Sequence, residues 1–461
     1  MKHFDTVIIG AGLTGLSTAH HLDAAAAATG QGGLANWLLI EREDRIGGLT
    51  RTEAIDGYHF NHTGHWLHLR DPAMQQLVDK LMGDEMQTVT RKSRIWSHGA
   101  LTRFPFQANL HGLPPDVVHD CLSGAIEAAL AEARGEHQPP RDFREFCMQT
   151  FGSGITDRFM VPYNTKLWGV PPEEISADWC GRFLPRPDIA QMTAGALGIT
   201  DPRIGYNATF VYPREGGIET FARRLAATID PGRIRLSTAP IAIDLAARRM
   251  RLDDGTEVSF GTIVSSIPLP ELFRLVAEVP AEVTSHVDKL RCTSLRFLLY
   301  GIRRPGVLDD IQWLYMPERR WPFYRIGCFS NAVASLAPAG CGGLYVECAN
   351  DVDASDDEVK AAVREFLRER GWLERDDEVE VEEVRHIRYG YVIFDDAYFP
   401  AREALLPWLQ ARGVHSLGRY GSWVYSSMED ALLDGQRVAG QLAGADSPDR
   451  SPKNPKIPRC P

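Results

Sequence analysis

A hydrophobic strand that runs directly into a Gly-x-Gly-x-x-Gly turn is the feature of this sequence that most limits its fold. The glycines are Gly10, Gly12 and Gly15, and a helix-forming run follows over 16–28. The first glycine permits a tight turn, the second lets the backbone approach a pyrophosphate, and the third lets the helix pack close to the strand. Because the amides at the start of that helix attract phosphate, the pattern predicts a dinucleotide site.

The next strand supports this interpretation. An apolar run over 37–40 ends in Glu41, an acid placed to accept hydrogen bonds from a ribose. The gap from the glycines exceeds the usual spacing of roughly 20 residues. Residues 24–28 and 30–33 account for the excess, since they extend the helix and its loop. A glycine-rich turn in some other α/β protein remains the alternative.

The segment after Glu41 distinguishes FAD from NAD. It reads Arg-Ile-Gly-Gly-Leu-Thr-Arg over 45–51, with Gly47 and Gly48 at its centre. A Gly-Gly turn at this point places backbone amides near a second phosphate and the start of a flavin. The segment resembles the FAD-binding signature of the amine-oxidase-like flavoproteins, so we expect FAD as the cofactor.

Composition excludes several classes of protein. The chain has 461 residues, a formal net charge of −11 and eight cysteines without C-x-x-C spacing. The acidic balance and the lack of a Lys/Arg-rich stretch argue against a nucleic-acid partner. The cysteine pattern suggests neither a metal site nor a disulfide framework, and no apolar run reaches the ~20 residues that span a bilayer. We therefore expect a cytoplasmic protein with no nucleic-acid or membrane partner and no metal.

The order of helical and strand-like segments predicts an α/β fold. Apolar residues recur at helical spacing over 114–200, short strands return over 206–270, and longer strands follow at 292–302 and 343–350. A helix over 355–370 starts with a capping box, and a strand at 414–417, a turn at 418–421 and a helix at 428–442 end the pattern.

We therefore expect a Rossmann-like FAD-binding domain that is interleaved with two others. The FAD-binding domain is assigned to residues 1–95, 206–270 and 410–445. A helical, substrate-covering domain is assigned to 110–205, and a substrate domain with a mixed or antiparallel sheet to 96–109 and 275–405. Residues 447–461 are rich in proline and poor in apolar residues, which predicts a disordered tail.

Several blocks of rare residues resemble the UDP-galactopyranose mutases, particularly their eukaryotic-type branch. The resemblance covers most of the chain, from Val7 to about Gly435. It rests on these segments: Gly-His-Trp at 64–66, Phe-Pro-Phe-Gln-x-Asn-Leu at 104–110, Phe-Met-Val-Pro-Tyr-Asn-x-Lys-Leu-Trp at 159–168, Asn-Ala-Thr-Phe at 207–210, Trp-Leu-Tyr at 313–315, Pro-Phe-Tyr-Arg at 322–325, Phe-Ser-Asn at 329–331 and Gly-Arg-Tyr-Gly-Ser-Trp-x-Tyr at 418–425.

The resemblance implies covalent catalysis by a cofactor. The mutases interconvert pyranose and furanose forms of a nucleotide-diphosphate sugar without net redox change. Their flavin must first be reduced, by NAD(P)H or a chemical reductant, and its N5 then forms an adduct with the sugar. The predicted partner of this chain is accordingly a nucleotide sugar, and its predicted class is an intramolecular transferase.

The resemblance also assigns site residues. The predicted catalytic residues are His65, Arg325, Tyr391 and Tyr425, of which Arg325 and the tyrosines hold the diphosphate and His65 lies beside the flavin. The predicted substrate-binding residues are Gln107, Tyr163, Trp168, Asn207, Trp313, Tyr315 and Asn331. The predicted cofactor-binding residues are Gly10, Gly12, Thr14, Gly15, Glu41, Arg42, Gly47, Gly48, Leu49, His65, Gly418, Arg419, Met428 and Glu429.

Each assignment has a structural alternative. Arg325 on its own would more readily be read as the partner of an acid at the edge of the core. Tyr391 and Tyr425 have the character of ordinary sheet aromatics. His65 is compatible with a structural role, and the aromatic residues of 163–168 with core packing.

Two positions depart from the mutases. Where they place a second diphosphate-binding arginine this chain has Val161, and where they place a tyrosine after Phe-Ser-Asn it has Ala332. The segment 426–431 is also shorter and more like the C-terminal FAD helix of ordinary amine-oxidase-like flavoproteins. Either other residues, such as Arg182 or Arg203, grip the diphosphate, or the donor is not UDP-galactose.

Three functions are consistent with these observations. The first is a sugar mutase that works with reduced flavin, and the second is an oxidoreductase of the amine-oxidase or protoporphyrinogen-oxidase type. The third is a flavoprotein whose site has decayed to a binding role, which the retained Arg325, Tyr391 and Tyr425 disfavour. The sequence names neither the sugar nor the nucleotide, and it leaves a monomer and a dimer equally open.

Overall fold

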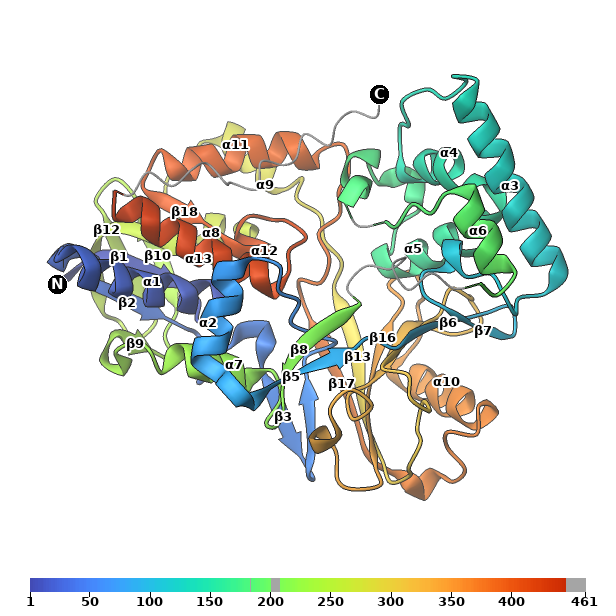
Figure 1. The fold of residues 1–461 in the computed structure, drawn as a ribbon. Coiled ribbons are helices and arrows are strands. Elements are labelled where there is room, and N and C mark those ends of the chain that lie inside the picture. Colours follow the sequence, from blue (N-terminus) through green and yellow to red (C-terminus); the bar gives the residue numbers. More distant parts are fainter. Residues whose placement is uncertain (183, 200–207, 445–461) are drawn as a thin grey trace.

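Two seven-stranded sheets and a group of helices organise residues 1–182, 184–199 and 208–444, the part of the chain that this computed structural model describes (Figure 1). One sheet lies beside the N-terminus and carries the glycine-rich turn. The other lies in the lower part of Figure 1. The expected α/β class is confirmed. The predicted disordered tail at 447–461 lies outside the described residues, and the three assigned domain ranges stay a prediction.

The first sheet has a parallel centre. Its order is β10-β11-β12-β1-β2-β9, and β18 pairs in parallel with β12. Strand β1 pairs in parallel with both β2 and β12, and every residue of β2 is buried, as expected for a strand covered on both faces. The bounds are β1 (Lys2–Ile9), β2 (Trp37–Ile40), β9 (Ile234–Arg235), β10 (Pro240–Asp244), β11 (Arg249–Leu252), β12 (Glu257–Ser265) and β18 (Val414–Ser416).

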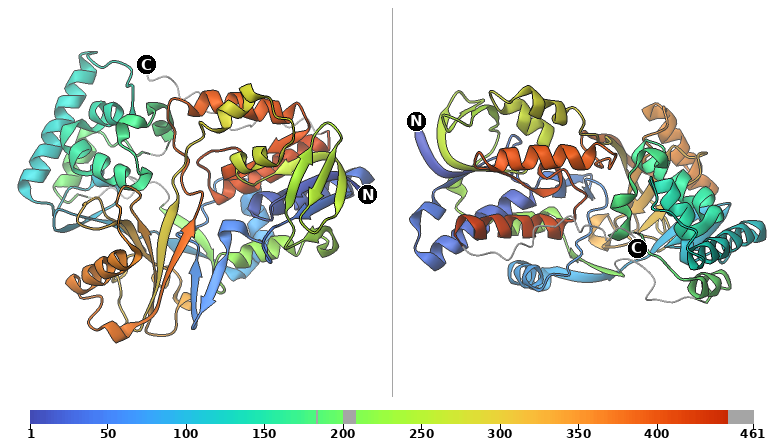
Figure 2. Two further views of the ribbon diagram at one scale, coloured as in Figure 1. Left: turned by 180° about the vertical axis from the view of Figure 1, so that it is seen from behind. Right: turned by 90° about the horizontal axis from the view of Figure 1, so that it is seen from above.

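Helices from opposite ends of the chain cover this sheet. Helix α1 (Leu13–Thr29) packs along α13 (Met428–Leu442), and Figure 2 shows the two side by side. Helices α8 (Leu269–Leu275) and α9 (Ala281–Val287) contact each other, and α11 (Tyr398–Gln410) packs on α9 and β18. The dinucleotide turn is thus fixed by residues at both ends of the sequence.

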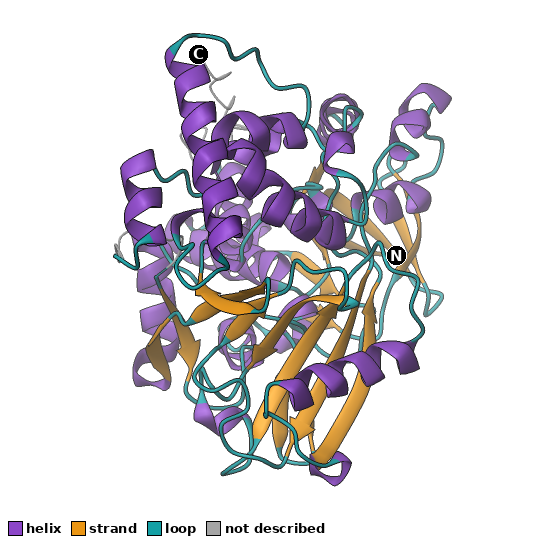
Figure 3. Ribbon diagram, turned by 90° about the vertical axis from the view of Figure 1, so that its right-hand side faces the viewer, coloured by secondary structure: helices purple, strands orange, loops and turns teal. Residues whose placement is uncertain are grey.

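The second sheet is mixed. Its order is β17-β13-β16-β15-β14-β6-β7, antiparallel except for the parallel pair of β14 and β6. Helix α10 (Asp356–Glu369) packs against it and lies across its strands in Figure 3. The bounds are β6 (Ser93–Ser97), β7 (Ala100–Arg103), β13 (Leu295–Ile302), β14 (Trp313–Tyr315), β15 (Phe323–Cys328), β16 (Gly342–Cys348) and β17 (Val379–Ile387).

Strand β13 illustrates how this sheet separates two cores. Alternate side chains of a strand point to opposite faces. Leu298 and Tyr300 accordingly pack in the cluster that includes α10, whereas Phe297 and Leu299 pack in the main core. The helix α10 begins with the predicted capping box between Ser355 and Glu358.

The helical segment over 115–196 is also as expected. It comprises α3 (Pro115–Ala133), α4 (Phe143–Ile155), a π-helix η5 (Thr156–Met160), α5 (Val161–Trp168) and α6 (Ile189–Ala196). These helices gather in the upper right of Figure 1. Helix α5 contacts β15 of the second sheet, and this places its side chains next to that sheet.

Smaller elements connect the larger ones. They are the pairs β3 (Thr52–Ile55) with β4 (Tyr58–Asn61) and β5 (Met86–Thr90) with β8 (Thr209–Pro213), and the helices α2 (Pro72–Met82) and α7 (Glu219–Ala226). Short 3-10 turns occur at Gly32–Ala35, Gly48–Thr50, Gly83–Glu85, Phe106–Ala108, Pro172–Glu174, Ala177–Arg182, Pro231–Arg233, Ala334–Leu336 and Asp376–Glu378.

Two local expectations were wrong. The residues expected to form a turn at 418–421 form a short helix, α12 (Gly418–Gly421). Helix α7 lies within a segment that we expected to return to short strands. Its apolar Phe221, Ala222 and Leu225 share one buried face, but a helix of eight residues is too short for that periodicity to stand out in the sequence.

No helix among the described residues is long and apolar enough to cross a membrane.

The crossing of α1 and α13 gives a stability prediction. A methyl group on Gly435 of α13 would lie 2.6 Å from the backbone nitrogen of Thr18 in α1, whereas a methyl on Gly440 of the same helix meets nothing within 4 Å. We expect Gly435→Ala to destabilise the protein by about 1–3 kcal/mol through overpacking. Gly440→Ala should stabilise it by up to about 1 kcal/mol through helix propensity. Thermal unfolding of both variants measures the difference, and equal melting temperatures would contradict this account of the crossing.

Candidate functional site

The turn from β1 into α1 has the geometry of a phosphate site. Gly10 has φ +98°, a left-handed value that glycine adopts without strain. A Cβ atom on Gly15 would lie 1.9 Å from the carbonyl oxygen of Gly10, so only glycine allows the helix to start this close to the strand. No side chain caps the N-terminus of α1. Its first amides are therefore available to a ligand phosphate.

Glu41 links this turn to the next loop. Its Oε2 accepts a hydrogen bond from the amide of Ala11 at 2.8 Å, and its Oε1 accepts one from the amide of Glu43 at 3.0 Å. A carboxylate can accept about four hydrogen bonds in all. Glu41 thus retains acceptor sites for ribose hydroxyls while the backbone fixes its position.

The Gly-Gly loop closes over the same turn. The amide of Gly47 donates to the carbonyl of Ala11 at 2.9 Å, and a Cβ on Gly48 would lie 3.1 Å from the Cα of Gly12. Leu49 lies in the 3-10 turn that follows. Arg42 instead points its largely exposed guanidinium at Glu43, so the structure does not bring it to this loop.

The C-terminal segment completes the cradle. Gly418 abuts Thr14 in the first turn of α1, and its amide donates to Asp434 at 3.0 Å. Met428 begins α13, and the carboxylate of Glu429 accepts hydrogen bonds from the amides of Arg70 and Asp71. The uncapped helix start, the acid after β2 and the two glycine loops therefore form a set of donors and acceptors that fits FAD.

A buried ion pair lies at the centre of the second sheet. Arg325 on β15 donates through Nη2 to both carboxylate oxygens of Glu347 on β16, at 2.7 and 2.5 Å. The Glu347 side chain has no solvent exposure, and that of Arg325 is 19% exposed. Tyr324 donates its hydroxyl to Glu347 at 2.7 Å. Arg325 therefore does pair with a core acid, yet one face of it remains open.

Arg325 keeps its positive charge although it is buried. Burial is the largest single influence and opposes a charged guanidinium, but the Glu347 carboxylate together with the neighbouring tyrosines outweighs it, and the pKa of Arg325 lies well above its usual value. Its Nε is buried without a hydrogen-bond partner. A buried N–H without an acceptor is costly, so this atom is a candidate donor to a ligand.

Two tyrosines and a second arginine adjoin this pair. Arg325 Nη2 lies 3.1 Å from the hydroxyl of Tyr391, whose ring stacks on that of Tyr425 with centroids 6.1 Å apart. The guanidinium of Arg419 lies 4.8 Å from the centre of the Tyr425 ring. Tyr425 is 39% exposed, which is unusual for a large ring. The structure thus brings Arg325, Tyr391, Tyr425 and Arg419 together from three distant segments.

His65 lies near both arginines and is uncharged at neutral pH. Burial lowers its pKa to about 4, with smaller contributions from His62 and Arg419. Its Nδ1 is buried without a hydrogen-bond partner. A neutral imidazole offers one donor and one acceptor, so His65 can accept or donate at a single atom without bringing a charge to the site.

Aromatic residues form a second part of the site. Trp313 donates its indole N–H to the hydroxyl of Tyr315 at 3.0 Å, and Arg91 donates to the same hydroxyl at 3.2 Å. The Arg91 guanidinium lies over the rings of Phe104 and Trp313, 4.5 and 4.8 Å from their centres. Tyr163 of α5 packs edge-on against Tyr315 at 5.5 Å. These rings adjoin Arg325 because Tyr315 is its register partner across β14 and β15.

Other predicted substrate residues expose little surface. Gln107 and Trp168 are each 2% exposed. Gln107 donates its amide to the carbonyl of Pro185 at 2.7 Å, and Trp168 packs edge-on against Tyr391 at 5.6 Å. Asn331 uses both amide hydrogens on the carbonyls of Val307 and Ile311. Their contact with a substrate stays a prediction.

At the positions of Val161 and Ala332, no described residue takes the place of the arginine and the tyrosine that the mutases have there. Val161 begins α5, and the amide of Ala332 donates to Phe329 in an apolar setting. Asn207 and Arg203 lie outside the described residues, and so does the side chain of Arg182. Among the described residues, Arg91 and Arg419 are the further cations that the structure brings to this cluster.

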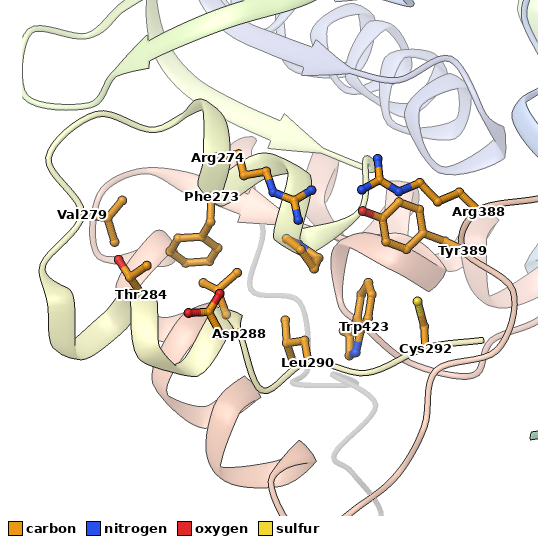
Figure 4. Close-up of a pocket in the computed structure, with 12 residues that line it drawn as sticks. Phe273, Arg274, Val279, Thr284, Asp288, Leu290, Cys292, Arg388, Tyr389 and Trp423 are labelled. Carbon is orange, nitrogen blue, oxygen red and sulfur yellow. The ribbon is translucent and has the colours of Figure 1, made fainter. Parts of the chain in front are cut away.

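A cavity of about 410 Å³ has a different set of lining residues (Figure 4). It is lined by α8, α9, Tyr389 and Trp423. None of the residues predicted for substrate or cofactor lines it. The cavity therefore does not enlarge the site described above.

Sequence reasoning missed Glu347, Arg91 and Lys166. Glu347 was detectable in principle, because it is a lone acid in the apolar strand Gly-Gly-Leu-Tyr-Val-Glu-Cys and buried acids require partners. Lys166 lay inside a quoted block but carried no predicted role. Arg91 gave no signal, since only the tertiary structure places it over Trp313.

Comparisons with known proteins agree with the fold. Residues 13–443 match the family of flavin containing amine oxidoreductases. A solved structure of reduced UDP-galactopyranose mutase is 26% identical, covers 98% of this chain and 97% of its own, and superposes with a TM-score of 0.88. Cyclohexylamine oxidase from Brevibacterium oxydans is 16% identical, covers 96% of this chain and 99% of its own with a TM-score of 0.66, and shows the fold alone.

A curated relative has an activity that differs from that of the mutase. Coproporphyrinogen III oxidase of Mycobacterium tuberculosis is 24% identical over 320 residues. That match covers 65% of this chain and 66% of the oxidase, which is just under two thirds of the relative's length.

The ion pair gives a second stability prediction. Arg325→Leu leaves the carboxylate of Glu347 buried without its cation, and we expect a loss of about 3–5 kcal/mol. In Arg325→Leu/Glu347→Gln no charge is buried, so most of that loss should be recovered. Denaturant unfolding of the wild type, both single variants and the double variant gives the coupling free energy. A loss in the double variant equal to the sum of the two single losses would show that the two side chains are not coupled.

Proposed function

The chain belongs to the flavin-containing amine oxidoreductase family, and we propose that it uses FAD in its reduced form to interconvert the pyranose and furanose forms of a nucleotide-diphosphate sugar. The reaction class is an isomerisation without net redox change. NAD(P)H or a chemical reductant activates the flavin, and the substrate is a small molecule.

One observation carries the proposal. Arg325, Tyr391 and Tyr425 come from three distant segments and meet beside the cofactor cradle, in a chain that is 26% identical to UDP-galactopyranose mutase over 98% of its length. A guanidinium and two phenol hydroxyls are suitable donors to a diphosphate. A simple amine substrate has no need of such a set.

Family membership implies FAD, and the residues of the cradle fit it. The start of α1, the Gly47–Gly48 loop and the cation of Arg419 would suit the pyrophosphate, and Glu41 would suit a ribose. When bound and reduced, FAD supplies an electron-rich ring nitrogen that can act as a nucleophile toward the anomeric carbon. His65 is uncharged and is proposed to fix or move a proton beside that ring.

The other residues act on the diphosphate. It leaves the anomeric carbon with developing negative charge and must stay close enough to return. Arg325 offers its unpartnered Nε and Tyr391 its hydroxyl, and fixed donors of this kind stabilise the transition state without reorganising. Trp66 and Trp313, stacked at 5.9 Å, line the site with rings that exclude water.

The donor proposed for this site differs from UDP-galactose. Val161 and Ala332 stand where the mutases have polar anchors, and Glu347 neutralises part of the charge on Arg325. Each missing charge-assisted hydrogen bond lowers affinity by about 1.5–3 kcal/mol. Arg91 supplies a cation at another point of the site, next to Tyr315, and is suited to a donor whose phosphates lie differently.

An oxidoreductase is the second candidate. The similarity to coproporphyrinogen III oxidase and the neutralised Arg325 both favour it, because a redox reaction on an organic substrate does not require a free diphosphate-binding cation. The two candidates differ in what is consumed. A mutase turns over with reduced flavin and no oxidant, whereas an oxidase consumes oxidant in proportion to the product it forms.

Turnover of nucleotide sugars is the direct test. The purified protein is expected to contain non-covalent FAD, which acid or heat releases. After anaerobic reduction with dithionite, it should convert a nucleotide-diphosphate pyranose to the furanose, whereas the oxidised protein should not. Chromatographic separation of the two sugar forms over a panel of nucleotide sugars measures this. Oxygen consumption with a porphyrinogen or an amine, together with no conversion of any sugar, would instead establish the oxidoreductase.

Restoring the missing anchors tests the altered donor. We expect Val161→Arg/Ala332→Tyr to bind UDP about 1–3 kcal/mol more tightly than the native protein, roughly 5- to 150-fold in Kd. Ile126→Arg, at an exposed position of α3, adds the same charge elsewhere and should leave Kd unchanged. Calorimetry on the three proteins decides the question. A native affinity equal to that of the double variant would mean that another cation already holds the diphosphate.

A further inference from the structure

A lysine is completely buried where α5 meets the second sheet. Lys166 has no solvent exposure. Its Nζ donates to three backbone carbonyls: those of Met316 at 2.8 Å, Glu318 at 3.0 Å and Phe323 at 2.6 Å. An ammonium group has three donors, so every one of them is used. Buried lysines are rare unless they are paired, and here no carboxylate oxygen of a described residue lies within ion-pair distance of Nζ.

All three acceptors belong to one hairpin. They lie in β15 or in the connection that joins β14 to it. Trp313 and Tyr315 are on β14, and Arg325 follows two residues after Phe323 on β15. The hairpin is thus the element that carries the proposed phosphate-binding arginine and two of the aromatic residues of the site.

Helix α5 carries Tyr163, which packs against the hairpin. Tyr163 precedes Lys166 by three positions on α5, so both side chains lie on the same face of that helix. The Tyr163 ring packs edge-on against Tyr315 at 5.5 Å and against Tyr324 at 6.1 Å. The position of Lys166 therefore sets how closely Tyr163 approaches Tyr315 and the strand of Arg325.

Neighbouring contacts make this junction stiff. The carboxylate of Glu318 accepts a hydrogen bond from the amide of His98 in the turn between β6 and β7. Arg319 pairs with Asp351 at 3.2 Å. Asn350 donates its amide to the carbonyl of Lys166 at 3.0 Å. The groups around the ammonium thus connect α5 and the hairpin with the segments that follow β6 and β16.

We propose that Lys166 is a positioning residue for the substrate site: its ammonium fixes the β14–β15 hairpin, which carries Arg325, against the helix that carries Tyr163. That the site binds a substrate phosphate rests on the proposed function. The attachment of the hairpin does not, and it can be measured without any substrate. An apolar side chain at this position would fill the same space but leave three buried carbonyls without donors, which is costly.

Hydrogen–deuterium exchange of the FAD-bound protein tests the attachment. Lys166→Met keeps the length of the side chain and removes all three donors, and Lys166→Gln keeps two. Thr165→Val is the matched control, because it removes a hydroxyl that bonds only within α5. Exchange over 313–328 should rise at least threefold in Lys166→Met, less in Lys166→Gln and not in the control. Exchange over 295–302, in the same sheet, should stay unchanged.

Two results of this experiment would overturn the proposal. One is hairpin exchange in Lys166→Met equal to that of the wild type. The other is an equal rise over 295–302, which would mean a general loss of stability. If Lys166→Met does not fold, the comparison of Lys166→Gln with Thr165→Val decides in the same way.

Nucleotide binding tests the positioning role and separates it from the proposed function. We expect calorimetry to show UDP bound at least tenfold more weakly by Lys166→Met than by the wild type, with the FAD content of both unchanged. A variant that binds UDP as the wild type does would overturn the positioning role. A wild type without measurable affinity for UDP or other nucleoside diphosphates would contradict the proposed function, and the exchange experiment would still decide whether Lys166 holds the hairpin.

Discussion

The site depends on one carboxylate that has no access to solvent. Glu347 lies in the second sheet and accepts hydrogen bonds from Arg325 and Tyr324. Burying an isolated charge is prohibitive, so Glu347 is compatible with the fold only while Arg325 stays beside it. The pair therefore fixes the guanidinium in the one place where it also reaches Tyr391. The charge needed for stability and the charge offered to a ligand belong to the same group.

The two sheets contribute different parts of the site. The first sheet supplies the start of α1, Glu41 and the glycine loops, which are suited to a dinucleotide. The second supplies Arg325 and the aromatic residues of β14. Arg419 and Tyr425 connect them, because they follow β18 of the first sheet yet stack on Tyr391 beside Arg325. The two sheets thus bring the proposed cofactor-binding groups and the proposed phosphate-binding groups close together.

The distribution of charge also limits the chemistry. Glu347 compensates Arg325, and Val161 supplies no second arginine. Within the part of the chain that the structure describes, Arg91 and Arg419 are the further cations beside the tyrosines, at different points of the site. A site of this kind binds a diphosphate less strongly than one with two uncompensated arginines in contact with it. This is why we propose the mutase reaction with a donor whose phosphates lie near Arg91 and Tyr315.

The sequence by itself determined the dinucleotide turn, the helices at 115–133 and 428–442, and the strands around the glycines, because glycine spacing and apolar periodicity act over a few residues. It also indicated Arg325 and Tyr425 through their blocks, and Tyr391 through the same family resemblance. It did not reveal that Arg325 is half of a buried pair, that Arg91 lies over Trp313, or that Lys166 holds the hairpin. Those three contacts join residues that lie 22, 222 and about 150 positions apart in the sequence, respectively. Only the tertiary structure decides such contacts, because the partner of a buried charge is chosen by packing in space and leaves no local pattern.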